Sequence, residues 1–122
     1  MQELTVEEIV TLHAAIIARD GGDDRIISEA NLHQLVFRSN QIAESIPRAA
    51  LALFSLVAYP AFREGNERAA LALATRILAK EGYAISAKDA ADFGQLAESV
   101  RAFTAEPEEI EAWLTIHVKK EQ

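Results

Sequence analysis

The stretch "RAALALFSLVAYPAFREGNERAALALATRILAK", residues 48–80, has two strongly apolar runs on either side of a short polar loop. Residues 48–58 are almost wholly apolar, which is typical of a helix buried on all sides within a small bundle. Pro60 prevents that helix from continuing, because proline lacks a backbone N–H and fixes φ. Asn66 is a suitable N-cap for the second helix. The stretch therefore predicts two central helices joined by a loop over residues 59–65.

Two more helices are predicted before this central pair. Thr5 and Glu8 have the spacing of a capping box, and Ser28 is a suitable N-cap for the second of these helices. Apolar side chains recur at helical spacing in both segments. In the first segment they are accompanied by a histidine, and the stripe is Ile9, Leu12, His13, Ile16 and Ile17.

Two further helices are predicted after the central pair. Gly82 ends the fourth helix, and Ser86 caps a fifth that runs to about Phe103. Glu106-Pro107 opens the last helix, which we expect to cover "EEIEAWLTIHVKK", with acidic residues first and lysines last as the helix dipole favours. We therefore predict an all-α fold, a compact bundle of about six helices. The whole chain, residues 1–122, is expected to form a single domain.

Composition excludes several classes of function. The chain has no cysteine, so disulfides, thiolate nucleophiles and cysteine metal sites are absent. The net charge of -7 disfavours direct nucleic-acid binding, which needs a basic face. No leader segment and no apolar run of membrane length is evident, so we expect a soluble cytoplasmic protein without membrane contact.

The loop between the central helices has the residues of an anion site. If Asn66 caps its helix, the amides of residues 65–68 point toward the loop. Arg68 adds a planar guanidinium suited to phosphate, and Glu64 is placed to hold a divalent cation that bridges two phosphates. Phe62 would anchor the loop in the core. Taken alone, Gly65-Asn66 before a helix is more typical of an ordinary capped turn than of an anion site, and both interpretations stay open at this point.

The order of residues in "PAFREGNER" resembles the signature loop of the Fic/Doc family, His-x-Phe-x-Asp/Glu-Gly/Ala-Asn-x-Arg. The matching residues, at the right spacing, are Phe62, Glu64, Gly65, Asn66 and Arg68. The segments "LTVEEIVTLHAAII", "LHQLVFRSNQ", "RAALALATRILAKEGY", "LAESVRAF" and "EEIEAWLTIH" also look like those of the death-on-curing (Doc) type. The short length, and Leu71 where many Fic adenylyltransferases have a second arginine, again favour Doc.

The resemblance implies an activity and partners. Fic proteins transfer AMP from ATP to a protein hydroxyl, whereas the Doc toxin transfers the γ-phosphate to a translation elongation factor and is neutralised by an antitoxin. By this resemblance Glu64 would hold Mg²⁺, Gly65 and Asn66 would bind phosphate oxygens, and Arg68 would neutralise charge on ATP. The implied partners are an antitoxin protein and a protein target in translation.

Two residues depart from the family pattern. Pro60 stands where the family has its catalytic histidine, and a general base is typically worth about 10²–10⁴ in rate. The adjacent Tyr59 is a poor base at neutral pH, because an unperturbed phenol has a pKa near 10. Glu67 stands where Doc-type proteins usually have lysine, and its carboxylate would repel a triphosphate. Both departures oppose nucleotide chemistry.

Other candidate residues have simpler interpretations. His13, His33 and His117 fall on three separate helices, so a zinc site is not expected. His13 lies on an apolar stripe and is interpreted as a core histidine. Trp113 and Phe103 are expected to pack in the core. Four arginines are predicted at the surface, one of which (Arg63) could flank the loop: Arg38, Arg48, Arg63 and Arg76.

The sequence therefore predicts a degenerate Doc-like protein of a toxin–antitoxin type system, catalytically impaired at Pro60. It would act by binding a partner, with weak or absent binding of Mg²⁺ and ATP. The alternative is an active transferase that moves a phosphoryl or AMP group to a protein hydroxyl with a different base. The family's self-inhibitory motif is missing, so control would come from another protein. The sequence predicts no oligomeric state.

Overall fold

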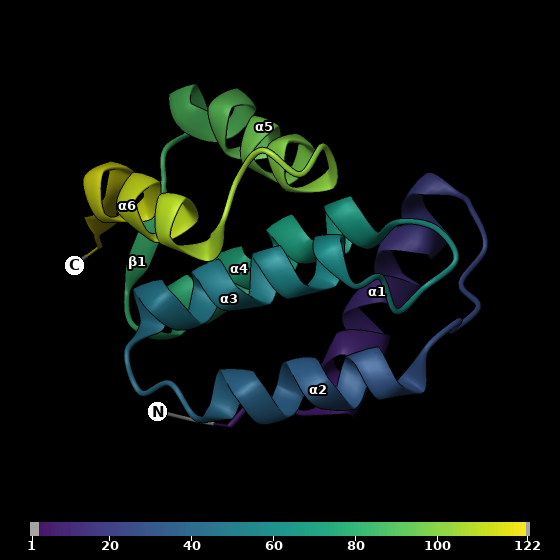
Figure 1. The fold of residues 1–122 in the computed structure, drawn as a ribbon. Coiled ribbons are helices and arrows are strands. Elements are labelled where there is room, and N and C mark those ends of the chain that lie inside the picture. The colour runs from purple at the N-terminus through teal and green to yellow at the C-terminus, as the bar shows by residue number, and fades with distance from the viewer. Residues whose placement is uncertain (1–2, 122) are drawn as a thin grey trace.

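Six α-helices account for most of residues 3–121, the part of the chain that the computed structural model describes (Figure 1). A short 3-10 turn precedes α5, and a two-stranded antiparallel sheet joins the end of α4 to the end of α6. The predicted all-α bundle of about six helices is confirmed. The elements are α1 (Val6–Asp20), α2 (Glu29–Asn40), α3 (Ser45–Ala58), α4 (Asn66–Lys80), β1 (Tyr83–Ile85), η1 (Ala87–Asp89), α5 (Ala90–Arg101), α6 (Pro107–His117) and β2 (Val118–Lys120).

Helices α3 and α4 are the central pair and form the largest helix contact of the bundle. In Figure 1 they lie between α1 and α2 on one side and α5 and α6 on the other. The buried residues of both helices are mostly alanine and leucine, and small alanine side chains allow close packing of helices. Leu53 of α3 and Leu73 of α4 are among them. Both leucines are fully buried, and each contributes about 1.5–3 kcal/mol by burial.

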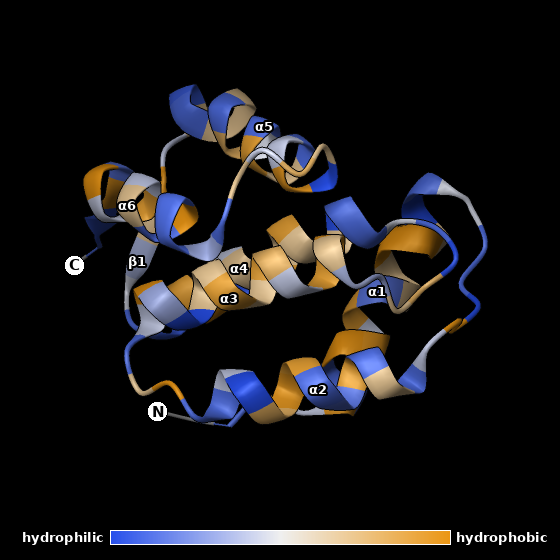
Figure 2. Ribbon diagram, viewed as in Figure 1, coloured by the Kyte–Doolittle hydropathy of each residue, from blue (hydrophilic) through white to orange (hydrophobic). Residues whose placement is uncertain are grey.

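The hydropathy of each helix matches the number of helices that it contacts. In Figure 2 apolar colour is concentrated on α3, whereas α2 and α5 alternate between apolar and polar residues around the helix. This difference is expected, because α3 contacts α2, α4, α5 and α6, while α2 has its main contacts with α3 alone. No helix of residues 3–121 is long and apolar enough to cross a membrane.

Most of the predicted helix starts are confirmed by their caps. The Thr5 hydroxyl accepts a hydrogen bond from the Glu8 amide at 3.1 Å, and the Ser28 hydroxyl accepts one from the Asn31 amide at 3.1 Å. Two caps differ from the prediction. Ser86 is the N-cap of the 3-10 turn η1, and α5 starts later, at Ala90, with Asp89 as its N-cap. Gly65, with φ of +80°, is the N-cap of α4, and Asn66 is the first residue of the helix. Its side chain makes other bonds, described below.

The C-terminal prediction was wrong in its last residues. Helix α6 ends at His117, and Val118–Lys120 pairs with Tyr83–Ile85 as strand β2. The β-branched Val118 takes an extended conformation, with φ of -74° and ψ of 148°. The Glu121 amide also donates to the Gly82 carbonyl at 2.6 Å. Backbone pairing with β1 thus replaces another helical turn.

The exposure of two side chains differs from the prediction made from the sequence. Arg48, expected at the surface, is only 5% exposed, and its Nε donates to the Ile42 carbonyl at 2.9 Å. The carbonyl satisfies part of the guanidinium, which makes its burial tolerable. Phe103, expected in the core, is 89% exposed, because the chain turns there with φ of +61° after α5 has ended at Arg101.

Candidate functional site

Helix α1 anchors the loop between α3 and α4 through His13. The His13 ring is 1% exposed and stacks on Phe62, with 3.6 Å between ring centroids and 6° between planes. Its Nε2 lies 2.7 Å from the Glu64 carbonyl oxygen. A carbonyl can only accept, so Nε2 carries the proton. The interpretation of His13 as a core histidine is confirmed, and the Phe62 ring is buried against it.

The segment before α2 holds the other side of the loop. Ile26 and Phe62 form an antiparallel bridge, in which the Ile27 amide donates to Ala61 at 2.7 Å and the Arg63 amide to Arg25 at 2.9 Å. The Asn31 side chain donates to the Pro60 carbonyl at 3.0 Å. The path of the loop at Pro60 is therefore fixed by hydrogen bonds as well as by the proline ring.

Asn66 closes the loop from within. Its Nδ2 donates to the Phe62 carbonyl at 2.7 Å, and its Oδ1 accepts from the Phe62 amide at 3.1 Å. These two backbone groups point away from the bridge with Ile26, so Asn66 is their partner in the loop. The carboxamide is used to shape the loop, and its two polar atoms are already engaged there. Only one N–H of Nδ2 is used in this way, so the second N–H could still donate to a phosphate oxygen.

A pocket of about 430 Å³ lies over the start of α4. It brings together seven of the nine predicted site residues with Val57 of α3 and Arg101 of α5, and the seven are Pro60, Arg63, Glu64, Gly65, Asn66, Glu67 and Arg68. Phe62 is 1% exposed beneath the loop, as expected for an anchor. Tyr59 lines a different pocket, between α2 and α3. The phenol of Tyr59 is thus directed away from the position where a base would be needed.

Each arginine of this loop pocket has a carboxylate partner. Arg68 lies 3.2 Å from Asp20, Arg63 lies 3.5 Å from Asp23, and Arg101 lies 2.7 Å from Glu67. Arg101 was missed by the sequence reasoning, since it belongs to α5 and carries no motif that connects it to the loop. An anion entering the pocket would have to compete with these three carboxylates for the guanidinium groups.

Two of the competing carboxylates have lowered pKa values. The hydrogen bond from Arg19 is the main cause that lowers the pKa of Asp20 to about 2, with a smaller contribution from Arg68. The backbone amide of Arg25 is the main cause that lowers the pKa of Asp23. Both groups are therefore ionised at neutral pH.

The fit to a divalent cation rests on Glu64 alone. One oxygen of its carboxylate accepts the Asp23 amide at 2.5 Å, and the other is left for a ligand. Among residues 3–121 no group of three or more His, Asp or Glu side chains is arranged to hold a metal ion. Mg²⁺ commonly binds through one carboxylate and substrate phosphates, so Glu64 could hold it only with a bound nucleotide.

The arrangement can bind an anion but has no evident group to move a proton. No side chain caps α4, and the first amides of a helix lack partners within the helix. None of the histidines in the described part of the chain lines the loop pocket. His33 is exposed on α2, and His117 stacks on Trp113 with 4.0 Å between ring centroids.

No protein-family model matches the sequence, and no curated protein is significantly similar to it. The functional argument thus depends on the loop residues and on the geometry described above.

Proposed function

We propose that this protein is a Doc-like domain that has lost its transferase activity and acts by binding a protein partner. In this proposal the loop pocket keeps a weak affinity for Mg²⁺ and ATP. The observation that carries it is Pro60, which lines the pocket at the position of the motif histidine. Proline has no titratable group, and neither Tyr59 nor a histidine lines this pocket to replace it.

The charges around the pocket support weak nucleotide affinity. All three arginines are paired, and Glu67 adds a carboxylate to the lining. Binding a triphosphate would break or share at least one of these pairs and bring like charges close together. Exposed ion pairs are individually weak, so the pairs reduce affinity without abolishing it. We expect a dissociation constant for Mg²⁺-ATP on the order of 1 mM or weaker.

The test of catalytic loss compares four proteins: the wild type, Pro60→His, Glu67→Lys and the double variant. Labelled ATP is offered on either the α- or the γ-phosphate, with a cell lysate as acceptor. The wild type should transfer nothing above background. The double variant should transfer more than the sum of the single variants, because base and donor site serve one transition state.

The hydrogen bonds of the loop make this test informative. Asn31 binds the Pro60 carbonyl and the bridge holds Ala61, and both contacts involve backbone groups that remain when residue 60 is changed. A histidine at this position would keep the loop path and expose its amide to water. Robust transfer by the wild type would overturn the proposal in favour of an active transferase with another base. The retained Gly65 and Arg68 in one pocket favour that second candidate.

The partner is tested separately. A small reading frame next to the gene should encode an antitoxin-like protein that forms a stable complex with this chain when both are expressed. Growth arrest of a host by the double variant, relieved by that second protein, would support the toxin origin. If the double variant binds Mg²⁺-ATP well yet transfers nothing, the origin as an enzyme is rejected and partner binding alone remains.

A further inference from the structure

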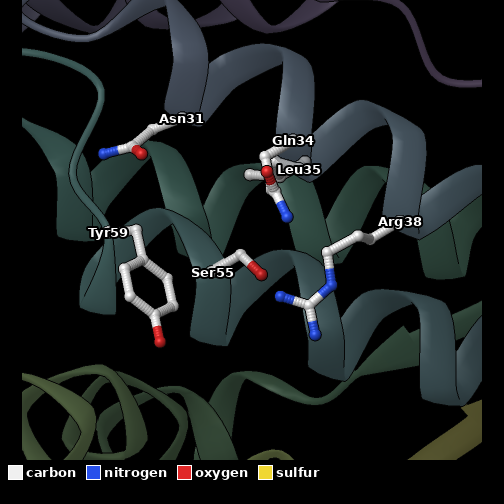
Figure 3. Close-up of a pocket in the computed structure, with 6 residues that line it drawn as sticks. All are labelled: Asn31, Gln34, Leu35, Arg38, Ser55 and Tyr59. Carbon is white, nitrogen blue, oxygen red and sulfur yellow. The ribbon is translucent and has the colours of Figure 1, made fainter.

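A second pocket, of about 330 Å³, lies between α2 and α3. Its lining shares no residue with the loop pocket and consists of Asn31, Gln34, Leu35, Arg38, Ser55 and Tyr59 (Figure 3). Pockets that bind small molecules run from about 300 to 1,000 Å³. This one is at the small end, so its size fits a small metabolite better than a nucleotide.

Ser55 is the feature that distinguishes this pocket from a surface hollow. The residue is 6% exposed, and its hydroxyl oxygen has no hydrogen-bond partner. Some helical hydroxyls donate to the carbonyl four residues earlier, as Thr75 does to Leu71 at 2.8 Å and Thr115 to Glu111 at 2.8 Å. The Ser55 hydroxyl makes no such bond. Figure 3 shows it pointing into the pocket, toward the side where Gln34 and Arg38 lie. Within residues 3–121 Ser39 is the other buried hydroxyl without a partner, but it does not line this pocket. Buried polar groups are normally satisfied, so a ligand atom is the partner this site lacks.

Arg38 gives the pocket its charge. It is the one charged residue of the lining, and it forms no ion pair with any residue of 3–121. Arg38 differs in this respect from the arginines of the loop pocket, each of which is paired with a carboxylate. A guanidinium binds a carboxylate with two parallel hydrogen bonds. A single cation matches a singly charged group better than a phosphate dianion.

The apolar residues of the lining indicate what kind of ligand body would fit the pocket. Leu35 lines the pocket and is 2% exposed, and the Tyr59 ring is held edge-on against Phe54, with 6.4 Å between centroids. These two side chains offer an apolar wall and a flat aromatic face. We propose that this pocket binds a small monocarboxylate with an aromatic or branched apolar body. The carboxylate would bind Arg38 and Gln34, the Ser55 hydroxyl would donate to it, and the body would pack on Leu35 and Tyr59. The proposal is independent of any activity at the loop.

Benzoate is the probe, and benzamide is its uncharged counterpart. Two-dimensional amide NMR spectra of the full chain are recorded while either compound is added to about 20 mM, a concentration that detects millimolar binding. Benzoate should shift the amide signals around Gln34–Arg38 and Ser55–Tyr59. Benzamide should bind at least tenfold more weakly, because it cannot pair with the guanidinium.

Three variants locate the site. Arg38→Gln should weaken benzoate binding at least tenfold, and Ser55→Ala about threefold or more. Ser55→Ala should also leave the protein folded and no less stable, since it removes an unsatisfied hydroxyl. Arg63→Gln is the matched control in the loop pocket and should leave benzoate affinity unchanged. The proposal is overturned if benzoate gives no saturable shifts, if benzamide binds equally well, or if Arg63→Gln weakens binding as much as Arg38→Gln.

Discussion

Asn66 has a structural role in the loop that is separate from the phosphate binding predicted for it. Its side chain satisfies both backbone polar groups of Phe62, a residue that is 1% exposed. Removing a partner from a buried backbone group costs more than the bond itself contributes, because the group is left without water. A loss of nucleotide binding in an Asn66 variant would therefore not identify Asn66 as a phosphate ligand, since the loop itself would have changed.

We expect Asn66→Ala to lower the free energy of unfolding by about 2–3 kcal/mol, measured by urea denaturation. Asn31→Ala is the matched control. It removes one bond, to the carbonyl of the exposed Pro60, and should cost less than about 1 kcal/mol. Equal losses in the two variants would mean that the Phe62 groups find other partners.

Asp20 gives a prediction about pH. Its carboxyl has a pKa lowered from 3.8 to about 2, chiefly by the hydrogen bond from Arg19 and less by Arg68. A lowered pKa means that the ionised form is favoured in the folded state, so its stabilising effect is present above pH 4 and is lost as the pH falls toward 2. In a carboxyl-carbon NMR titration, Arg19→Gln should raise the pKa of Asp20 more than Arg68→Gln does. A larger rise in the Arg68 variant would show that the contact across to α4 dominates.

At the scale of elements, the helices were predictable and their ends less so. Caps such as Thr5 and Ser28 act through residues three positions away, and a local pattern of this kind is visible in a sequence. The start of α4 was misplaced by one residue, because the preference of Asn66 for a cap is outweighed by its bonds to Phe62. Strand β2 was missed because its partner, β1, precedes it by more than thirty residues.

The candidate site was predictable only where it is local. Pro60 and residues 63–68 adjoin in the sequence and share one pocket. Arg101 and Asp20 reach the site from α5 and α1, and these contacts depend on how the helices pack. The same holds for the second pocket, in which Arg38 and Ser55 come from different helices. Side chains brought together by tertiary packing leave no spacing that a single sequence reveals.

The turn into α4 provides a test with an internal control. Gly65 has φ of +80°, and a Cβ there would lie 3.1 Å from Ile17 Cδ1 and 3.3 Å from His13 Nε2. Gly65→Ala should destabilise the protein by about 1–3 kcal/mol, because an alanine is strained at this positive φ and its Cβ would crowd the side chains of α1. Gly94 lies within α5, and apart from its chain neighbours and the nearby backbone of α5 itself no atom is within 4 Å of its added Cβ. Gly94→Ala should stabilise by about 0.5–1 kcal/mol, because alanine favours helix. A destabilised Gly94→Ala protein, measured by thermal melting, would show that this face of α5 is packed.

At the scale of the molecule, the pair α3 and α4 connects two groups of helices. Helices α1 and α2 pack on one side of the pair, and α5 and α6 on the other (Figure 1). The loop pocket takes residues from α3, α4 and α5 and is braced by His13 of α1. Its geometry consequently depends on both sides of the bundle being folded together. If the whole chain is a single cooperative domain, as predicted, both sides of the bundle fold and unfold together, and this can be measured in unfolding experiments.

We expect the two sides to unfold in one transition. Trp113 is the only tryptophan, and it stacks on Phe93 and His117 on the side of α5 and α6. Leu32 is fully buried on α2, on the opposite side. Leu32→Ala removes buried apolar atoms and should cost about 2–5 kcal/mol. In a two-state protein this loss must lower the urea midpoint of Trp113 fluorescence as much as that of helical circular dichroism.

The control is Ile116→Ala, a change on α6 near Trp113 in sequence, where the side chain is 77% exposed. Since little area is buried there, both midpoints should stay close to the wild-type values. If Leu32→Ala lowers the circular dichroism midpoint while the fluorescence midpoint is unchanged, α5 and α6 remain folded on α3 and α4 after α2 has detached. In that case the bundle consists of two cooperative units. The loop pocket would then lose its support from α1 and α2 before its contacts to α5, and ligand binding would fail before Trp113 reports unfolding.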